Sequence, residues 1–279
     1  MAVPSARPTS TKNLLMRTWG LDMSTSASGT AAVALEWTGE HAKVALVHTP
    51  LDAAAVVNLI AAESQWQWAV DVPFGWPSRY VEFLQRRRHH PLTGSDLEVI
   101  EDRRTWRTST LAQRATDVFL TGHPQIKARP LPAAFQMLGA TAAMWALIEA
   151  DLAERDVVVD RSGMTGTVCE TYPRAALNAW AWTKKGKLTL DDLCRLFPFL
   201  RVGRDLEESF ASHDVCDALV CAVVARARHL GLTLCPQDLD QAREEGWIHV
   251  SLAQPHQLVG SSSTNSRPTE GAPEDPSRP

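Results

Sequence analysis

Residues 212–227 read SHDVCDALVCAVVARA, and this stretch predicts the helix around which the fold is organised. Apolar and small residues dominate it, neither Gly nor Pro interrupts it, and Gly231 stops it just beyond. Ser212 is suited to be its N-cap. Asp214 and Asp217 are three residues apart, so their carboxylates lie on one helical face, one turn apart.

This helical face has two interpretations. Below the two acids come Ala218, Cys221 and Ala225, which are small enough to let a neighbouring element approach closely. Two carboxylates held together in apolar surroundings repel each other, and a divalent cation such as Mg²⁺, which takes oxygen ligands, relieves that repulsion. Alternatively, both acids simply stand near the helix start and favour the positive end of its dipole.

The composition is that of a soluble globular protein, with 44% hydrophobic and 22% charged residues among 279. A net charge of -4 gives no overall signal for nucleic acid, so such binding would require a local basic patch. The five cysteines are scattered and form no CxxC pair, which argues against a disulfide framework or a zinc site and favours the cytoplasm. No run of about 18 apolar residues predicts a membrane span.

We expect one domain, residues 16–255, between two disordered termini. Residues 1–15 lack the apolar segment of a secretory signal, and residues 256–279 are rich in Ser, Pro and Glu. Inside the domain, residues 79–155 depart from the strand pattern. They predict a helical insertion after the fourth strand, which includes a long helix at 131–155.

The remaining pattern predicts a mixed, five-stranded α/β sheet flanked by helices. Three strands come first, and a helix at 51–64 leads to the fourth strand. Three antiparallel strands, a crossover helix and a parallel strand make a mixed sheet. The expected strands are residues 14–22, 31–37, 42–48, 66–70 and 165–170.

Three of the predicted strands end in an acid, namely Asp22, Asp71 and Glu170. A turn follows each of them, and a proline comes soon after Asp71 and Glu170. In open α/β sheets, ligands bind at the carboxyl ends of the strands. Any one of these acids could merely end a strand, but strand-end acids combined with the two helical acids favour a common site.

Basic residues in the insertion are candidates for contacts with nucleic acid. Residues 86–90 read RRRHH, and Arg103 and Arg104 lie close to Trp106. Arginines of this kind can follow a phosphate backbone while an aromatic ring stacks on a base. Because acids lie between the two basic clusters, a solvated helical face is the alternative.

Two further residues are candidate substrate contacts. Arg114 could contact a phosphate, although its spacing from Asp117 also fits a helical ion pair. His213 directly precedes the first helical acid and could donate to a phosphate or to a water near a metal. A surface or capping role is the alternative for His213.

Five motifs occur in an order that resembles the domain of unknown function family 429. The resemblance covers roughly residues 17–232. Members of that family are predicted nucleases with an RNase H-like fold, so the resemblance implies this fold and activity. The motifs are GLD at 20–22, VDVPFGWP at 70–77, RATD at 114–117, ETYP at 170–173 and HDVCDALVCAVVARA at 213–227.

The helical DxxDA also resembles the last acidic helix of RuvC-type Holliday-junction resolvases. In those enzymes one acid ends the first strand, one ends the fourth, and two lie on the final helix. The matching residues here are Asp22, Asp71, Asp214 and Asp217, which the resemblance makes ligands of Mg²⁺ or Mn²⁺. Glu170, from the ETYP motif, is an added ligand or a helper. The fourth-strand acid is Asp rather than Glu, and the basic surface of a resolvase is not evident.

The sequence therefore predicts a cytoplasmic, metal-dependent nuclease acting on DNA or RNA, and a homodimer if it follows the resolvases. Four carboxylates could hold two ions roughly 3.5–4 Å apart. One alternative is an ATP-dependent phosphotransferase of the sugar-kinase and actin-like class, in which the turn at 22–29 would hold phosphates. The other is a non-catalytic nucleic-acid-binding module that keeps the acids for structure.

Overall fold

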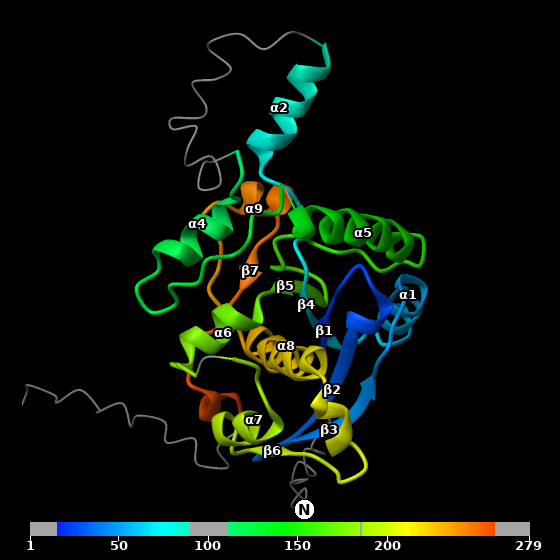
Figure 1. Ribbon diagram of the computed structural model, residues 1–279, viewed down its shortest axis with the longest axis vertical. Coiled ribbons are helices and arrows are strands. Elements are labelled where there is room, and N and C mark those ends of the chain that lie inside the picture. Colours follow the sequence, from blue (N-terminus) through cyan, green and yellow to red (C-terminus); the bar gives the residue numbers. More distant parts are fainter. Residues whose placement is uncertain (1–15, 90–110, 135, 185, 260–279) are drawn as a thin grey trace, which may run out of the picture.

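A mixed β-sheet forms the centre of the molecule (Figure 1). The computed structural model describes residues 16–89, 111–134, 136–184 and 186–259. Seven strands lie in the spatial order β6-β3-β2-β1-β4-β5-β7. Their bounds are Met16–Asp22 (β1), Ala31–Thr38 (β2), His41–His48 (β3), Gln67–Asp71 (β4), Val168–Thr171 (β5), Leu200–Arg201 (β6) and Ile248–His249 (β7).

The strand pairing confirms the predicted mixed sheet but not its size. β2 pairs antiparallel with both β1 and β3, whereas β4 pairs parallel with β1, and β5 pairs parallel with β4. The predicted count of five is wrong, because β6 and β7 add one strand at each edge. Each edge strand has only two residues, too few to show the alternation by which strands are recognised in a sequence.

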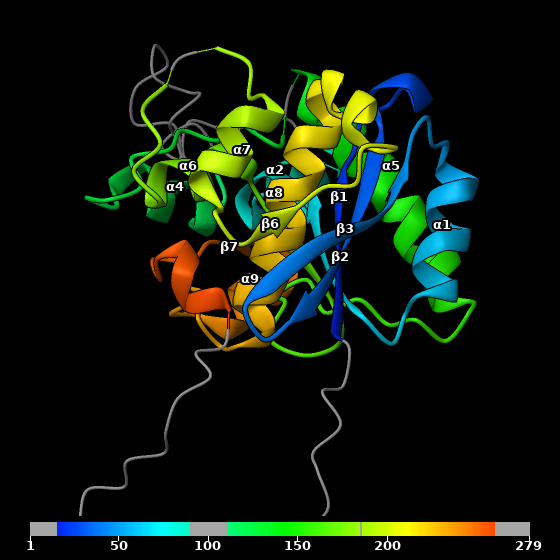
Figure 2. The ribbon, with the colours of Figure 1, turned by 90° about the horizontal axis from the view of Figure 1, so that it is seen from below.

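Helices cover both faces of the sheet (Figure 2). α8 lies along one face with α6 and α7, and α1 and α5 cover the other. The helices are Ala53–Ala62 (α1), Ser78–His89 (α2), Ala115–Gly122 (α4), Gln136–Ala153 (α5), Pro173–Ala179 (α6), Leu190–Leu196 (α7), His213–His229 (α8) and Leu239–Glu245 (α9). Short 3-10 turns occur at Ala27–Gly29, Glu207–Ala211 and Pro255–Leu258.

Local signals account for the two ends of α8. The helix begins directly after Ser212, as predicted, but this side chain does not cap the backbone. Its hydroxyl instead donates a hydrogen bond of 3.1 Å to the carboxylate of Asp214. The chain leaves the helix at Gly231, whose φ of 68° suits a residue without a Cβ atom.

The closest approach between α8 and the sheet occurs at Gly20 of β1. A Cβ atom at position 20 would overlap the backbone of Ala218 and Ala222. Two residues earlier, the hydroxyl of Thr18 donates to the carbonyl of Ala222 over 2.8 Å. β1 and α8 therefore run in opposite directions. The N-terminus of α8 consequently lies over the carboxyl end of β1.

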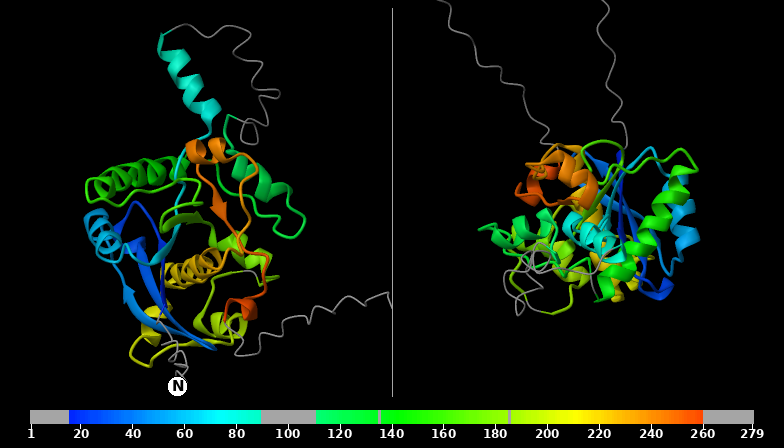
Figure 3. Two further views of the ribbon diagram at one scale, coloured as in Figure 1. Left: turned by 180° about the vertical axis from the view of Figure 1, so that it is seen from behind. Right: turned by 90° about the horizontal axis from the view of Figure 1, so that it is seen from above.

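The segment predicted as a helical insertion is helical over much of its described part. α2 extends away from the sheet, whereas α4 and α5 lie against the body of the molecule (Figure 3). Arg103, Arg104 and Trp106 lie outside the described residues. At the other end, the fold continues past the predicted boundary at 255, because Leu258 is fully buried.

All five cysteines are free thiols, and Cys169, Cys216 and Cys221 are buried. In the described parts of the chain, no helix has both the length and the apolar character needed to cross a bilayer.

The contact at Gly20 leads to a stability prediction. Gly20→Ala should lower the free energy of unfolding by about 3 kcal/mol, the upper end of the usual range for overpacking, because the added methyl group forces β1 and α8 apart. Gly39→Ala is the matched control, since nothing lies within 4 Å of a Cβ atom at that hairpin position. Urea unfolding followed by circular dichroism measures both. Equal stability of the two variants would contradict the close contact.

Candidate functional site

Two carboxylates lie side by side at the carboxyl edge of the sheet. Asp22 is the last residue of β1 and Asp71 the last of β4, and the parallel register places them directly opposite each other. Both strands are buried along their middle residues and become partly accessible again at these final acids. The sheet therefore holds two acids together at its edge, where ligands bind in open α/β sheets.

The first two turns of α8 bring two more carboxylates to the same edge. Because α8 runs opposite to β1 from the contact at Gly20, Asp217 and Asp214 lie toward Asp22. The charges act on one another, since both helical acids raise the pKa of Asp22. The structure thus brings together the four acids that the sequence singled out. We call Asp22, Asp71, Asp214 and Asp217 the carboxylate cluster.

The cluster is a place of unfavourable electrostatics. Burial raises the pKa of Asp22 well above its ordinary value, and the charge of Asp71 raises it further. Burial likewise raises the pKa of Asp71, with Asp217 adding to the effect. For Asp217, burial raises the pKa, and the nearby His213 opposes that rise. Each carboxylate would be more readily ionised if a cation joined the group.

Hydrogen bonding does not relieve this repulsion. None of the described residues donates a hydrogen bond to Asp22, Asp71 or Asp217, and Asp214 accepts only the bond from Ser212. In the parts of the chain that the structure describes, no three His, Cys, Asp or Glu side chains already stand as a complete metal site. The repulsion among the four acids is therefore left to be relieved by protonation or by a bound cation.

Two positively charged or chargeable groups flank the cluster. Arg174, the second residue of α6, is exposed, and among the described residues it makes no ion pair. Together with His213 it acts on Asp217 to lower its pKa. The Nδ1 atom of His213 is buried and has no hydrogen-bond partner in the described part of the chain. Arg174 directly follows the ETYP motif, but only the fold places its charge where it acts on Asp217.

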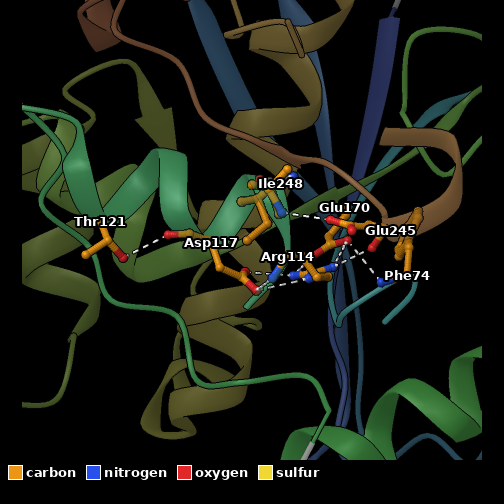
Figure 4. A network of polar contacts seen from close by, with 9 residues as sticks. Phe74, Arg114, Asp117, Thr121, Glu170, Glu245 and Ile248 are labelled. Atoms are coloured by element: carbon orange, nitrogen blue, oxygen red, sulfur yellow. Dashed lines mark hydrogen bonds and ion pairs between the residues drawn. The ribbon is translucent and has the colours of Figure 1, made fainter. Parts of the chain in front are cut away.

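Glu170 of β5 is paired with Val70, the residue before Asp71, and its carboxylate is bound by Arg114 (Figure 4). Its two carboxylate oxygens accept hydrogen bonds from the guanidinium group of Arg114, over 2.7 and 2.9 Å. One of them also accepts the backbone N–H of Phe74 at 3.0 Å. Arg114 makes a second ion pair with Asp117, over 3.1 Å, and all three charged side chains are almost completely buried.

This buried network corrects two predicted roles. Arg114 was predicted to contact substrate, but its guanidinium group is held inside the protein between two carboxylates. Burial alone would lower the pKa of Arg114, and the two carboxylates reverse that effect, so it stays charged. Glu170 was predicted to be an added ligand or a helper in catalysis, but both of its carboxylate oxygens already accept hydrogen bonds from Arg114 or Phe74. Both residues position the strand ends rather than offer free groups.

A further buried acid, Glu245, ties the starts of α2 and α4 to this network. One of its oxygens accepts both the N–H and the hydroxyl of Ser78, at the start of α2. The other accepts the N–H of Ala115, at the start of α4, over 2.7 Å. The next residue, Gly246, has a φ of 87°, and a Cβ atom there would press on Glu170 and Arg114. Sequence alone gave no signal for Glu245, since its partners are distant in the chain.

The fold and the site together define a class of protein. It is a mixed α/β sheet with helices on both faces, whose carboxyl edge carries four converging carboxylates next to a buried ion-pair network. The family described as "Protein of unknown function (DUF429)" matches residues 20–241, so the chain belongs to that family. Comparison with curated proteins and with solved structures found no match.

The buried network can be tested by removing its cation. Arg114→Met should lower the free energy of unfolding by about 3–5 kcal/mol, because Asp117 and Glu170 are left as uncompensated buried charges. Arg243→Met removes the exposed pair with Asp240 and should cost no more than about 1 kcal/mol. Chemical denaturation measures both. Similar losses in the two variants would show that the buried network does not stabilise the fold.

Repulsion within the cluster predicts a dependence on pH. When a folded-state pKa lies above the unfolded value, the folded state binds more protons, so stability falls as pH rises above about 3.8. Asp71→Asn removes one repelling charge. In EDTA at pH 7 it should raise the melting temperature by about 3 °C, as expected for ~1 kcal/mol in a chain of this size. The gain should shrink toward pH 4.

Thermal unfolding of the parent and of Asp71→Asn across this pH range provides the measurement. Asp240→Asn, at an exposed position outside the cluster, is the control and should show no such pH-dependent gain. A parent protein that is more stable than Asp71→Asn at pH 7 without metal would mean that the carboxylates do not repel.

Proposed function

We propose that this protein is a nuclease that hydrolyses phosphodiester bonds with the help of Mg²⁺ or Mn²⁺. The observation that supports it is the carboxylate cluster: four acids from two strand ends and one helix converge, and three of them lack any hydrogen-bond donor among the described residues. Acids kept in such an arrangement reduce stability, and oxygen-rich groups of this kind are what hard divalent cations bind.

The donor set fits divalent cations of this type. Asp22, Asp71 and Asp217 would hold the ions, with Asp214 at the accessible end of the cluster. Bound cations of this kind supply Lewis-acid polarisation of a phosphate and make a water molecule more acidic. The protein itself contributes the fixed positions of the acids, which follow from the register of β1 and β4 and from the contact of α8 at Gly20.

Groups around the cluster suit an anionic substrate. Arg174 is exposed and unpaired among the described residues, so it is free to contact a phosphate oxygen. His213, with its unpartnered Nδ1 atom, can donate to a phosphate or hold a proton near Asp217. These two side chains would orient the phosphate, while the carboxylates would keep the ions in place.

Nucleic acid, rather than a small phosphate ester, is favoured by the projecting helix α2. Its exposed arginines include Arg79, Arg87 and Arg88, and the helix stands well away from the sheet (Figure 1). A ligand that contacts both these arginines and the cluster must be long and carry repeated negative charges, as a nucleic-acid strand does. We also propose a cytoplasmic location, on the basis of the free cysteines. A homodimer stays a prediction.

Metal binding and cleavage test this proposal together. In calorimetry the parent should bind Mn²⁺, and Asp217→Asn should bind it at least ~100-fold more weakly, since even residues that only support a metal ligand change affinity 10–100-fold. Cleavage of a mixed set of DNA and RNA substrates with Mg²⁺ should fall by a similar factor. Asp240→Asn, at an exposed position away from the cluster, should match the parent in both assays.

The alternatives give different outcomes in the same experiments. Metal-independent binding of nucleic acid, with no cleavage of any substrate, would favour a non-catalytic module. Tight binding of ATP near the turn at 22–29, without nucleic-acid cleavage, would favour a phosphotransferase. Full activity of Asp217→Asn would show that the cluster is not the site of the reaction.

A further inference from the structure

A small cavity opens directly beside the carboxylate cluster. Its volume is about 150 Å³, and its wall includes Asp71 and Tyr172. Burial raises the pKa of Tyr172, and the nearby charges of Asp71 and Asp217 raise it further. The cavity and the cluster therefore share a wall. A group that enters the cavity must lie within a short distance of whatever the cluster binds.

The size of the cavity fits one planar ring system. Pockets that enclose a drug-sized ligand typically measure roughly 300–1,000 Å³. This cavity is about half the lower limit or less, so it cannot take a whole dinucleotide or a large cofactor. A single planar heterocycle is the right scale.

The lining suits a ring with apolar faces and polar edges. Flat or apolar surfaces come from Pro73, Pro130, Leu138 and Tyr172. The lining also includes the polar side chains of Thr141 and Thr171, beside the already paired Arg114 and Glu170. Nucleobases have this combination of stacking faces and hydrogen-bonding edges.

Charge excludes a phosphate from the same cavity. Arg114 is the one guanidinium group among its described lining residues, and it is already paired with Asp117 and Glu170. Asp71 adds another carboxylate to the wall. The charged lining residues therefore carry a net negative formal charge, which disfavours an anion but tolerates a neutral base.

We propose that this cavity receives one unpaired nucleobase of the strand whose phosphate lies at the carboxylate cluster. The inference rests on the proposed nuclease function and narrows its substrate class. A base in a duplex is paired and stacked, so it must leave the helix to enter such a cavity. The substrate is consequently single-stranded, or carries an unpaired nucleotide at the reaction site.

The test is an abasic scan of binding, performed in Ca²⁺. A fluorescent single-stranded DNA decamer and its RNA counterpart are compared with versions that lack one base at each position in turn. Loss of the base that enters the cavity should weaken binding roughly tenfold, within the range measured for bases stacked on protein rings. A fully paired duplex should bind at least about tenfold more weakly than the single strand.

Two variants block the cavity. Leu138→Trp fills it from α5, and Leu131→Trp narrows it from a position that is already half exposed, so it should leave folding intact. In both variants, removing the base that enters the cavity should weaken binding by less than about twofold. We call this loss of affinity the position-specific penalty. Leu147→Trp places the same side chain on the exposed side of α5 and should keep the full penalty. Melting temperatures confirm that each variant is folded.

The outcomes separate this inference from the proposed function. Three results would overturn the inference: equal binding whichever base is removed, a penalty that persists in a folded cavity variant, or no binding of either strand. Mn²⁺ binding by the carboxylate cluster, measured independently, would leave the nuclease proposal intact in each of those cases. A clear penalty without metal binding would support the cavity assignment and count against the nuclease.

Discussion

The contact between Gly20 and the backbone of α8 is the constraint on which the candidate site depends. Without a side chain at position 20, the helix settles directly on β1, and the hydroxyl of Thr18 fixes its position by bonding to Ala222. This contact sets how far along the strand the helix begins. It thereby places Asp214 and Asp217 near the end of β1, where Asp22 lies. A helix shifted by one turn would leave the two groups of acids apart, and the edge of the sheet would have no cluster.

Buried charges in this protein fall into two neighbouring groups with opposite character. Around Arg114, one cation meets two carboxylates with direct hydrogen bonds, and the donors and acceptors are satisfied. In the carboxylate cluster, acids meet acids, and both burial and mutual repulsion raise the pKa of Asp22. The first group stabilises the base of the insertion, since Glu245 on α9 binds the starts of α2 and α4 beside it. The second group reduces stability unless a cation joins it, which is the usual signature of a functional site.

The proposed function uses both groups. The ion-pair network forms the floor of the cavity beside Asp71, so it shapes the surface next to the cluster without offering a free cation. Arg174 and His213 both act on Asp217, where positive charge helps an anionic substrate to approach. A phosphate at the cluster and a base in the cavity would be parts of one nucleotide.

The sequence by itself determined the strand-end acids, the paired acids of the last helix and the order of the central strands, because those features depend on local periodicity and on the family motifs. It did not reveal β6 or β7, which are too short to have a pattern, nor the role of Glu245, whose partners are more than a hundred residues away. It also assigned Arg114 and Glu170 to substrate and catalysis. Only the tertiary structure decided that they bind each other, because a residue type reveals its charge but not whether folding places a counter-charge within reach.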